Sequence, residues 1–333
     1  MDRPRITVCI PAYNQPEYLR QALASLCDQG LGRDEYVVSI SDDASPTRLE
    51  AVAAAFADRL QVEYRRNATN LGHLANFAQS FGTAKTPYVS FLTHDDVIAP
   101  GQLGRALAAI EGDTGAVLAA SLVLCQRYPG APDTRMHGTF LRGSQASFSE
   151  PYVWDRTEWM ALALTTTPLS IVGSVFHAAT FDRCGHWKRF PLWHDRLMLA
   201  EMGLHGAVVS LPWIGGYYRV GAGQLSGRLW ETDRREFLEV SQLVLDLCHS
   251  ARIPVVDFWI VHICAATPDE RITYLQMLDT ALPRDVFTAI KHGSEQKLGS
   301  RLHLGGRLDR LGIPRPVADL VKRVDRLLAG RRS

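Results

Sequence analysis

Two pairs of adjacent carboxylates are the residues of this sequence best suited to chemistry. Asp42-Asp43 and Asp95-Asp96 lie about 50 residues apart, and each follows a short apolar run rich in β-branched and aromatic residues. Adjacent carboxylates on a rigid strand end suit Mg²⁺ or Mn²⁺, which take oxygen ligands and often share them with substrate phosphates. One such pair could equally cap the next helix, but two pairs at equivalent positions favour a ligand site.

A third candidate acid is Asp195, which follows Trp193-His194 and begins a segment with helical spacing. A carboxylate there could act as the general base that takes a proton from an acceptor hydroxyl. The same position suits a helix cap. Position alone leaves both roles open.

The elements that would position these acids alternate along the first 127 residues. Strand-like runs are expected at 6–10, 36–41, 62–65, 88–92 and 116–126, and helices at 17–29, 46–60, 74–82 and 100–110. This alternation predicts an α/β fold with a mostly parallel sheet and helices on both faces. Both acid pairs then lie at the carboxyl ends of strands, where open α/β sheets bind ligands.

The remaining chain changes character twice. Residues 128–150 contain several Pro and Gly and are expected to form a long loop, followed by helices at 154–166 and from 195, and strands at 170–177 and 206–211. Helical spacing then dominates, at 236–250, 256–266, 270–281, 285–291 and 316–329. We therefore predict one domain over 1–228, divided near 127 into two halves, and a helical C-terminal region over 229–333.

Composition narrows the functional class. The 333 residues carry 36 Lys and Arg against 35 Asp and Glu, a net charge of +1, so bulk charge predicts no nucleic-acid partner. Residues 291–333 nevertheless hold 11 basic and 4 acidic residues, a net of +7. The expected helix at 316–329 is amphipathic and basic, so it either docks on the protein or contacts an anionic membrane surface. A homodimer through the C-terminal helices is a further expectation.

The cellular compartment is expected to be the cytoplasm, with at most peripheral contact at the inner face of the membrane. Six cysteines show no Cys-x-x-Cys spacing, which is typical of reduced structural thiols. The longest apolar run, 116–125, is too short to span a bilayer, and the N-terminus lacks a signal-like apolar segment.

Six ordered segments resemble family 2 glycosyltransferases of the GT-A fold, which are inverting enzymes that use nucleotide-diphospho sugars. Four of them precede residue 97: Ile10-Pro11-Ala12-Tyr13-Asn14, Ile40-Ser41-Asp42-Asp43-Ala44-Ser45, Asn70-Leu71-Gly72 with Asn76, and Tyr88 to Asp96. Two come later: Gly173-Ser174-Val175-Phe176 with Gly185 and His194-Asp195, and Tyr218-Arg219-Val220 with Gln224-Leu225-Ser226. The resemblance covers about residues 4–228. It makes 1–127 the nucleotide-sugar-binding half and 128–228 the acceptor half with the catalytic base.

The resemblance implies a role for each matching residue. Pro11, Ala12 and Tyr13 would line the nucleobase pocket, and Asp43 would bond the base edge. Asp95 would approach the ribose or diphosphate, and Asp96, with Asp95, would hold Mn²⁺ or Mg²⁺. Asp195 would be the catalytic base. Contacts with the acceptor or the diphosphate would come from Trp193 and His194.

Two positions depart from the family pattern. Thr93 stands where the family often has the first acid of its DxD motif, and Gly221 stands where some relatives have a His. Metal dependence is therefore expected to be weaker than usual. His94 is a further candidate ligand, although strand alternation should turn it away from Asp95.

The function implied is single-displacement transfer of a sugar, from a UDP- or dTDP-sugar as the expected donor, to an acceptor hydroxyl. The acceptor could be a sugar, a lipid-linked precursor or a small molecule. A catalytically degenerate nucleotide-sugar-binding protein is the main alternative. A nucleotidyltransferase is a weaker one, because residues 11–16 contain neither the glycines nor the basic residue of a phosphate loop.

Overall fold

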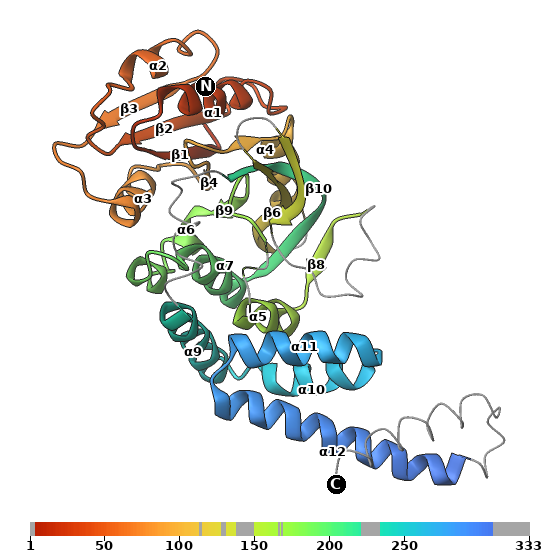
Figure 1. Ribbon diagram of the computed structural model, residues 1–333. Helices are drawn as coiled ribbons and strands as arrows, with labels where there is room; N and C mark the ends of the chain where they lie inside the picture. The colour runs from red at the N-terminus through yellow and green to blue at the C-terminus, as the bar shows by residue number, and fades with distance from the viewer. Residues whose placement is uncertain are drawn as a thin grey trace. The chain divides into compact units, whose positions relative to one another are not determined.

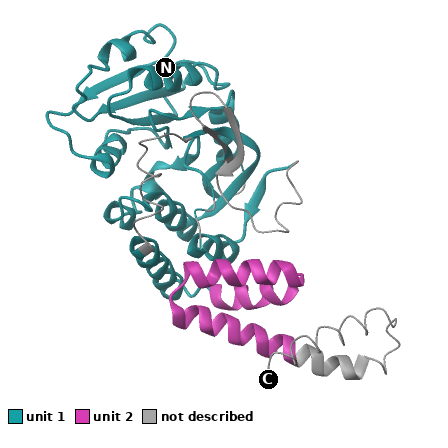
Figure 2. Cartoon of the chain, in the orientation of Figure 1, with its two compact units in different colours: residues 1–253 teal, residues 254–333 magenta. Residues whose placement is uncertain are grey.

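The chain forms two compact units, Met1–Ile253 and Pro254–Ser333 (Figure 2). The computed structural model describes residues 4–112, 115–127, 131–137, 150–165, 167, 169–220 and 234–308. The boundary that we predicted at 228/229 falls on residues outside these ranges. The following helix, α9 (Arg234–Ser250), belongs to the first unit rather than to the C-terminal one.

A ten-stranded sheet, counted over the described residues, organises the first unit (Figure 1). Its main path runs β3 (Val62–Arg66), β2 (Tyr36–Asp42), β1 (Ile6–Ala12), β4 (Tyr88–Phe91), β9 (Val175–His177), β6 (Ala116–Arg127), β10 (Ala207–Val220) and β5 (Val97–Ile98). Parallel pairing joins β1 to β2 and β4, β2 to β3, and β6 to β10. The predicted α/β class with a mostly parallel sheet is confirmed. The exceptions on this path are β9, which pairs antiparallel with both β4 and β6, and β5, which pairs antiparallel with β10.

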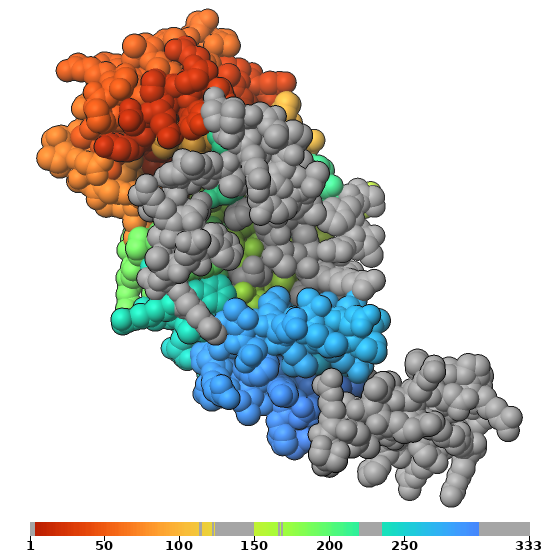
Figure 3. Space-filling model, in the orientation of Figure 1, coloured from red at the N-terminus to blue at the C-terminus, as the bar shows by residue number. Residues whose placement is uncertain are grey.

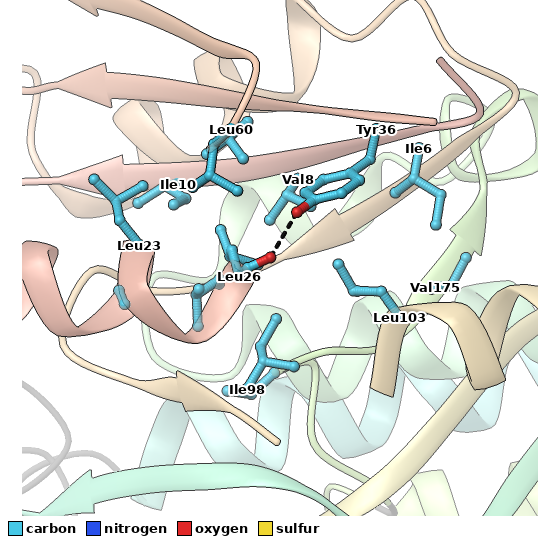
Figure 4. Close-up of a cluster of buried hydrophobic side chains, with 14 of the residues drawn as sticks. Ile6, Val8, Ile10, Leu23, Leu26, Tyr36, Leu60, Ile98, Leu103 and Val175 are labelled. Carbon is cyan, nitrogen blue, oxygen red and sulfur yellow. Dashed lines mark hydrogen bonds between the residues drawn. The ribbon is translucent and has the colours of Figure 1, made fainter. Parts of the chain in front are cut away.

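Side-chain alternation assigns helices to the two faces of this sheet. Ile6, Val8 and Ile10 of β1 share one apolar cluster with residues of α1 (Pro16–Leu26), α2 (Glu50–Ala54) and α4 (Gln102–Glu111). Within this cluster the Tyr36 hydroxyl donates to the Leu26 carbonyl at 2.6 Å (Figure 4). The alternate residues of β2 face α3 (His73–Gly82) on the opposite side, where Ser41 donates to Asn76.

Helices dominate the second half of the first unit. They are α5 (Arg156–Thr165), α6 (Ala178–Phe181), the 3₁₀ helix η2 (His186–Arg189), α7 (His194–His205) and α9. Arg196 of α7 joins three of them: its buried guanidinium donates to the carbonyls of Ala163 and Leu164 in α5 and to Ser241 in α9. The start of α7 is thereby tied to two neighbouring helices.

The structure differs from the expected elements where Pro and Gly residues interrupt the periodic pattern from which strands are predicted. The loop expected at 128–150 contains a strand, β7 (Ala131–His137), paired with β6, and a further strand, β8 (Tyr152–Trp154), pairs with β10. The strand β10 continues through Pro212 and Gly215 instead of ending at residue 211, because β-bulges absorb the irregular residues. Gly216 is required there, since a Cβ would press on the Val97 carbonyl.

The second unit contains α10 (Val255–Ala265), α11 (Pro268–Ala281) and α12 (Arg284–Leu308), which confirms the expected C-terminal helical region. A reciprocal capping box between Thr267 and Glu270 begins α11. The expected basic helix at 316–329 lies outside the described residues. Within the ranges given above, no helix combines the length and apolar character needed to cross a bilayer.

A substitution at Gly203 of α7 can show how tightly this helix packs on α5. A Cβ at Gly203 would overlap the ring of Trp159, which is 1% exposed and donates from Nε1 to the Leu199 carbonyl at 2.9 Å. Although Ala normally favours a helix over Gly, we expect Gly203→Ala to destabilise the protein by about 1–3 kcal/mol through overpacking. Thermal denaturation measures this.

The matched control is Gly82→Ala in α3, where a Cβ would meet nothing within 4 Å. This variant should be neutral or slightly stabilising. Equal melting temperatures for the two variants would show that the α5–α7 contact is looser than described.

Candidate active site

The two acid pairs lie at the carboxyl ends of β2 and β4, the two parallel strands that flank β1, as the sequence predicts. Asp42 ends β2 directly beside Ala12, the last residue of β1. Asp95 and Asp96 follow β4, which pairs with the other edge of β1. In the space-filling view the N-terminal part of the chain, coloured red to orange, gathers at one end of the first unit (Figure 3).

Asp42 is fully buried and organises the turn after β2. Its Oδ1 accepts the Ser45 amide at 2.9 Å, and its Oδ2 accepts Tyr64 Oη at 2.5 Å and Arg66 Nη1 at 3.0 Å. Burial alone would raise the pKa of Asp42, but hydrogen bonds from Ser45, Tyr64 and Arg66 together lower it. Asp42 therefore has a structural role, and it shapes the loop that carries Asp43.

Asp43 is 2% exposed and holds the loop that leads into α3. Its Oδ1 accepts the Leu71 amide at 2.8 Å and Asn67 Nδ2 at 3.0 Å, and its Oδ2 accepts the Gly72 amide at 3.0 Å. Each carboxylate oxygen can accept about two hydrogen bonds. Counting partners among the described residues, Oδ2 retains one acceptor position. The predicted contact with a base edge would have to use it.

The loop after β1 presents Tyr13 to solvent. Pro11 and Ala12 are buried, whereas Tyr13 is 45% exposed. Asn14 and Gln15 both adopt left-handed backbone conformations (φ 57° and 56°), and the Asn14 amide donates to Ser45 Oγ at 2.7 Å. This geometry leaves the ring of Tyr13 available as a stacking surface at the sheet edge.

His94 braces the same loop. Its Nδ1 lies 3.3 Å from the Pro11 carbonyl and its Nε2 lies 3.2 Å from Gln15 Oε1, so both ring nitrogens already have protein partners. Burial lowers the pKa of His94, and neighbouring Asp95 opposes this. The ring is thus directed toward the loop after β1 and not toward a metal site at Asp95.

The second acid pair divides into a buried and a more accessible member. Asp96 is 2% exposed, accepts the Arg219 amide of β10 at 2.8 Å and also accepts the Thr93 hydroxyl. Burial, followed by the charge of Asp95, raises the pKa of Asp96 well above its usual range. Asp95 is only partly buried. Thr93, which stands where the family often has an acid, thus donates a hydrogen bond to Asp96.

The third acid, Asp195, lies in the first turn of α7 and is half-buried. Its Oδ1 accepts the Arg196 amide at 2.7 Å. His194 is 8% exposed, and its Nδ1 lies 3.2 Å from the Pro191 carbonyl. The Trp193 ring packs edge-on against Phe237 of α9 at 4.7 Å, so it contacts the protein interior at least in part.

His73, which sequence reasoning did not select, connects the separate acids. Its ring lies 5.1 Å from that of His194, edge to face, although the residue as a whole is exposed. Loss of hydration around the ring, then His194, lowers the pKa of His73 to about 4, while Asp95 and Asp195 act in the opposite direction. His73 is therefore within electrostatic reach of both carboxylates. The only available signal was its place directly after Asn70-Leu71-Gly72.

The carboxylate oxygens at this site suit a divalent metal ion such as Mg²⁺ that is held by few protein ligands. Among the described residues, no three His, Cys, Asp or Glu side chains group as metal ligands. Mg²⁺ is nevertheless commonly held by one or two carboxylates together with substrate phosphates. The partly accessible Asp95 fits such a site better than Asp96, whose two oxygens already accept protein hydrogen bonds.

The Glycosyl transferase family 2 profile matches residues 7–162, which include all of the strands and acids of the first half. Residues 7–162 are a glycosyl transferase family 2 domain. The resemblance found in the motifs is thereby confirmed. Asp195 and its helix lie beyond the matched residues.

Curated relatives match less than half of this chain. Abequosyltransferase RfbV of Salmonella typhimurium is 31% identical over 124 residues, which cover 37% of this chain and 35% of that protein. Validoxylamine A glucosyltransferase of Streptomyces hygroscopicus subsp. jinggangensis is 29% identical over 137 residues, covering 40% and 32%. The chain therefore spans about a third of the length of these relatives.

Solved structures extend the likeness of fold beyond that segment. The crystal structure of S. aureus TarS 1–349 in complex with UDP-GlcNAc aligns with a TM-score of 0.58 at 15% identity, over 87% of this chain and 88% of that one. TarS 1–349 in complex with UDP aligns similarly, with a TM-score of 0.57 at 16% identity. Over the aligned residues, the fold of this chain is thus similar to that of TarS 1–349.

Asp42 should make stability depend on acid pH. Because its pKa is lower in the folded state, its contribution is present above the unfolded value of about 3.9 and is lost as the pH falls through the folded value. We expect Asp42→Asn to destabilise the protein by about 1–3 kcal/mol at neutral pH. The difference in melting temperature from wild type should shrink below about pH 4.

Tyr64→Phe is the graded comparison, because it removes only one of the donors to Asp42. Its destabilisation should be smaller than that of Asp42→Asn. A constant difference between wild type and Asp42→Asn from pH 7 to pH 3 would contradict a lowered pKa.

Proposed function

We propose that this chain is an inverting glycosyltransferase that moves a sugar from a nucleotide-diphospho sugar to an acceptor hydroxyl. The observation that carries the proposal is that the start of α7, which bears Asp195, lies against the start of α3: the rings of His194 and His73 are 5.1 Å apart. The loop that leads into α3 is itself held by Asp43 at the edge of the sheet, within the residues that match family 2.

The donor would bind at the carboxyl edge of β2, β1 and β4. Tyr13 offers an exposed aromatic face for the nucleobase, Pro11 and Ala12 form the buried floor beneath the loop, and Asp43 Oδ2 retains an acceptor position. A UDP- or dTDP-sugar is the proposed donor. The UDP and UDP-GlcNAc complexes of TarS support a uridine nucleotide.

In the proposed reaction Asp195 takes the proton of the acceptor hydroxyl as its oxygen attacks the anomeric carbon. The bond from that carbon to the diphosphate oxygen breaks on the opposite face, and its electron pair leaves with the nucleoside diphosphate. A single displacement of this kind inverts the anomeric centre. His194 and Trp193, which directly precede Asp195, are the proposed acceptor or diphosphate contacts.

Mn²⁺ or Mg²⁺ is the proposed cofactor, and when bound it would neutralise charge on the leaving diphosphate. Asp95 would be its principal protein ligand. Asp96, which we expected to share this role, would act chiefly by holding β10 against the turn that carries Asp95.

The acceptor remains a sugar, a lipid-linked precursor or a small molecule in this proposal. Peripheral contact with the inner face of the membrane would use the basic helix expected at 316–329, and a homodimer would use the C-terminal helices. Both rest on sequence alone.

A donor screen tests the function. Purified protein is incubated with Mn²⁺ and a panel of UDP-, dTDP- and GDP-sugars, and released nucleoside diphosphate is measured. Release from one class of donor supports the proposal. A donor-induced thermal shift without release, across the panel and in the presence of sugar acceptors, would instead favour a nucleotide-sugar-binding protein without catalysis.

Asp195→Asn should lower turnover by about 10²–10⁴-fold, the range typical of general-base catalysis. Donor binding, measured by thermal shift, should persist because Asp195 is assigned to the acceptor side. Asp182→Asn is the matched control, since this exposed Asp ends α6 in the same half of the unit. Near-normal turnover in Asp195→Asn would exclude the assignment of the base.

Asp95→Asn should raise the Mn²⁺ concentration for half-maximal rate by about tenfold or more, because even indirect partners of a metal act in this range. Asp96→Asn should change this concentration less and lower the melting temperature more, since Asp96 bonds Thr93 and Arg219. Titration of the initial rate with MnCl₂, alongside thermal denaturation, compares the two. The reverse order of effects would assign the metal to Asp96.

A further inference from the structure

The segment that leads into α7 is held by a carboxylate from another helix. The amides of Leu192 and Trp193 donate to Oε1 of Glu236, at 2.7 Å and 3.1 Å. Trp193 is the N-cap residue of α7, and its side chain makes no capping hydrogen bond. Glu236 lies in the first turn of α9, more than 40 residues later in the chain. A distant helix thus supplies the acceptor that fixes the backbone immediately before Asp195.

The residue after Asp195 is anchored to the same helix. The Arg196 guanidinium donates to Ser241 Oγ at 2.8 Å and to the Phe237 carbonyl at 3.4 Å, and it lies over the Phe237 ring at 4.5 Å. The Trp193 ring packs on the same Phe237. Contacts with α9 therefore flank Asp195 on both sides along the chain, while the Asp195 side chain bonds only its own helix turn through the Arg196 amide among the hydrogen bonds described.

We propose that Glu236 is the positioning residue for Asp195: its carboxylate fixes the start of α7, and α9 thereby sets where the base meets the acceptor hydroxyl. The proposal rests on the assignment of Asp195 as the base. A general base must lie within hydrogen-bond reach of the proton that it removes. A displacement of about 1 Å can cost on the order of 10²-fold in rate, so a backbone clamp beside the base controls turnover without touching substrate.

Both amides donate to the same oxygen of Glu236, so two variants can separate the loss of this acceptor from the loss of the side-chain charge. Glu236→Gln retains Oε1 as an acceptor at similar size, whereas Glu236→Leu removes the acceptor and keeps much of the side-chain volume. Glu239→Leu is the matched control one turn further along α9. Glu239 lines the same cavity of about 280 Å³ as Glu236, but its described partner is Arg235 at the surface (2.8 Å).

The first readout is independent of any donor. Hydrogen exchange of the amides in residues 192–197 is compared by mass spectrometry in the full-length variants. Exchange should accelerate in Glu236→Leu, remain near wild type in Glu236→Gln, and be unchanged in Glu239→Leu. Unchanged exchange in Glu236→Leu would overturn the proposal whatever the activity of the protein.

The second readout is turnover of the panel sugar that releases nucleoside diphosphate fastest with Mn²⁺. Glu236→Leu should lower kcat by roughly 10–100-fold, with the KM for the donor within about threefold of wild type, and Glu236→Gln should restore most of the rate. A parallel rise in donor KM, or equal losses in Glu236→Leu and Glu239→Leu, would assign Glu236 a general structural role instead and contradict the proposal.

A double-mutant cycle separates this proposal from the assignment of the base. If Glu236 acts through Asp195, adding Glu236→Leu to Asp195→Asn should lower the rate little further, because residues that act as a unit are not additive. Additive losses would overturn the positioning role while leaving Asp195 as the base. Normal turnover in Asp195→Asn alone would instead remove the base assignment, and with it the catalytic purpose proposed for Glu236.

Discussion

The need of buried carboxylates for hydrogen-bond donors shapes every loop around the candidate active site. A charged group removed from water is stable only when donors surround it. Asp43 therefore draws in the amides of Leu71 and Gly72, and Asp96 draws in the amide of Arg219 from β10. The acids at the sheet edge thus bring together chain segments up to 123 residues apart. The site is assembled around these buried carboxyl groups.

The acids differ in how far the protein itself satisfies them. Asp42 and Asp43 are both buried and accept hydrogen bonds from the protein, as does Asp96, whereas its neighbour Asp95 stays partly accessible. A carboxylate pair in sequence therefore does not by itself imply a pair of ligands.

Local patterns predicted the parallel strands, the carboxyl-edge position of the acids and the C-terminal helices, because these follow from periodicities of two and 3.6 residues. The strands β5 and β8 are two and three residues long and leave no periodic signal. The contacts of Asp96 with Arg219, of Glu236 with Trp193 and of His73 with His194 depend on tertiary pairing over long stretches of chain. Spacing does not encode such pairings, so the roles of His73 and Glu236 emerged only from the structure.

The position of β6 in the sheet has a consequence for folding during synthesis. Strands β1 to β4 pair among themselves and are complete once residue 91 has emerged. Strand β6 can pair first with β7, which ends at residue 137, but obtains its neighbours β9 and β10 only later, at residues 177 and 220. At translation rates of about 5–20 residues per second, β6 waits roughly 5–20 s for its last partner. The part of the sheet built from β1 to β4 can therefore form on the ribosome first, while the edge of β6 that awaits β10 stays exposed to chaperones and to mispairing.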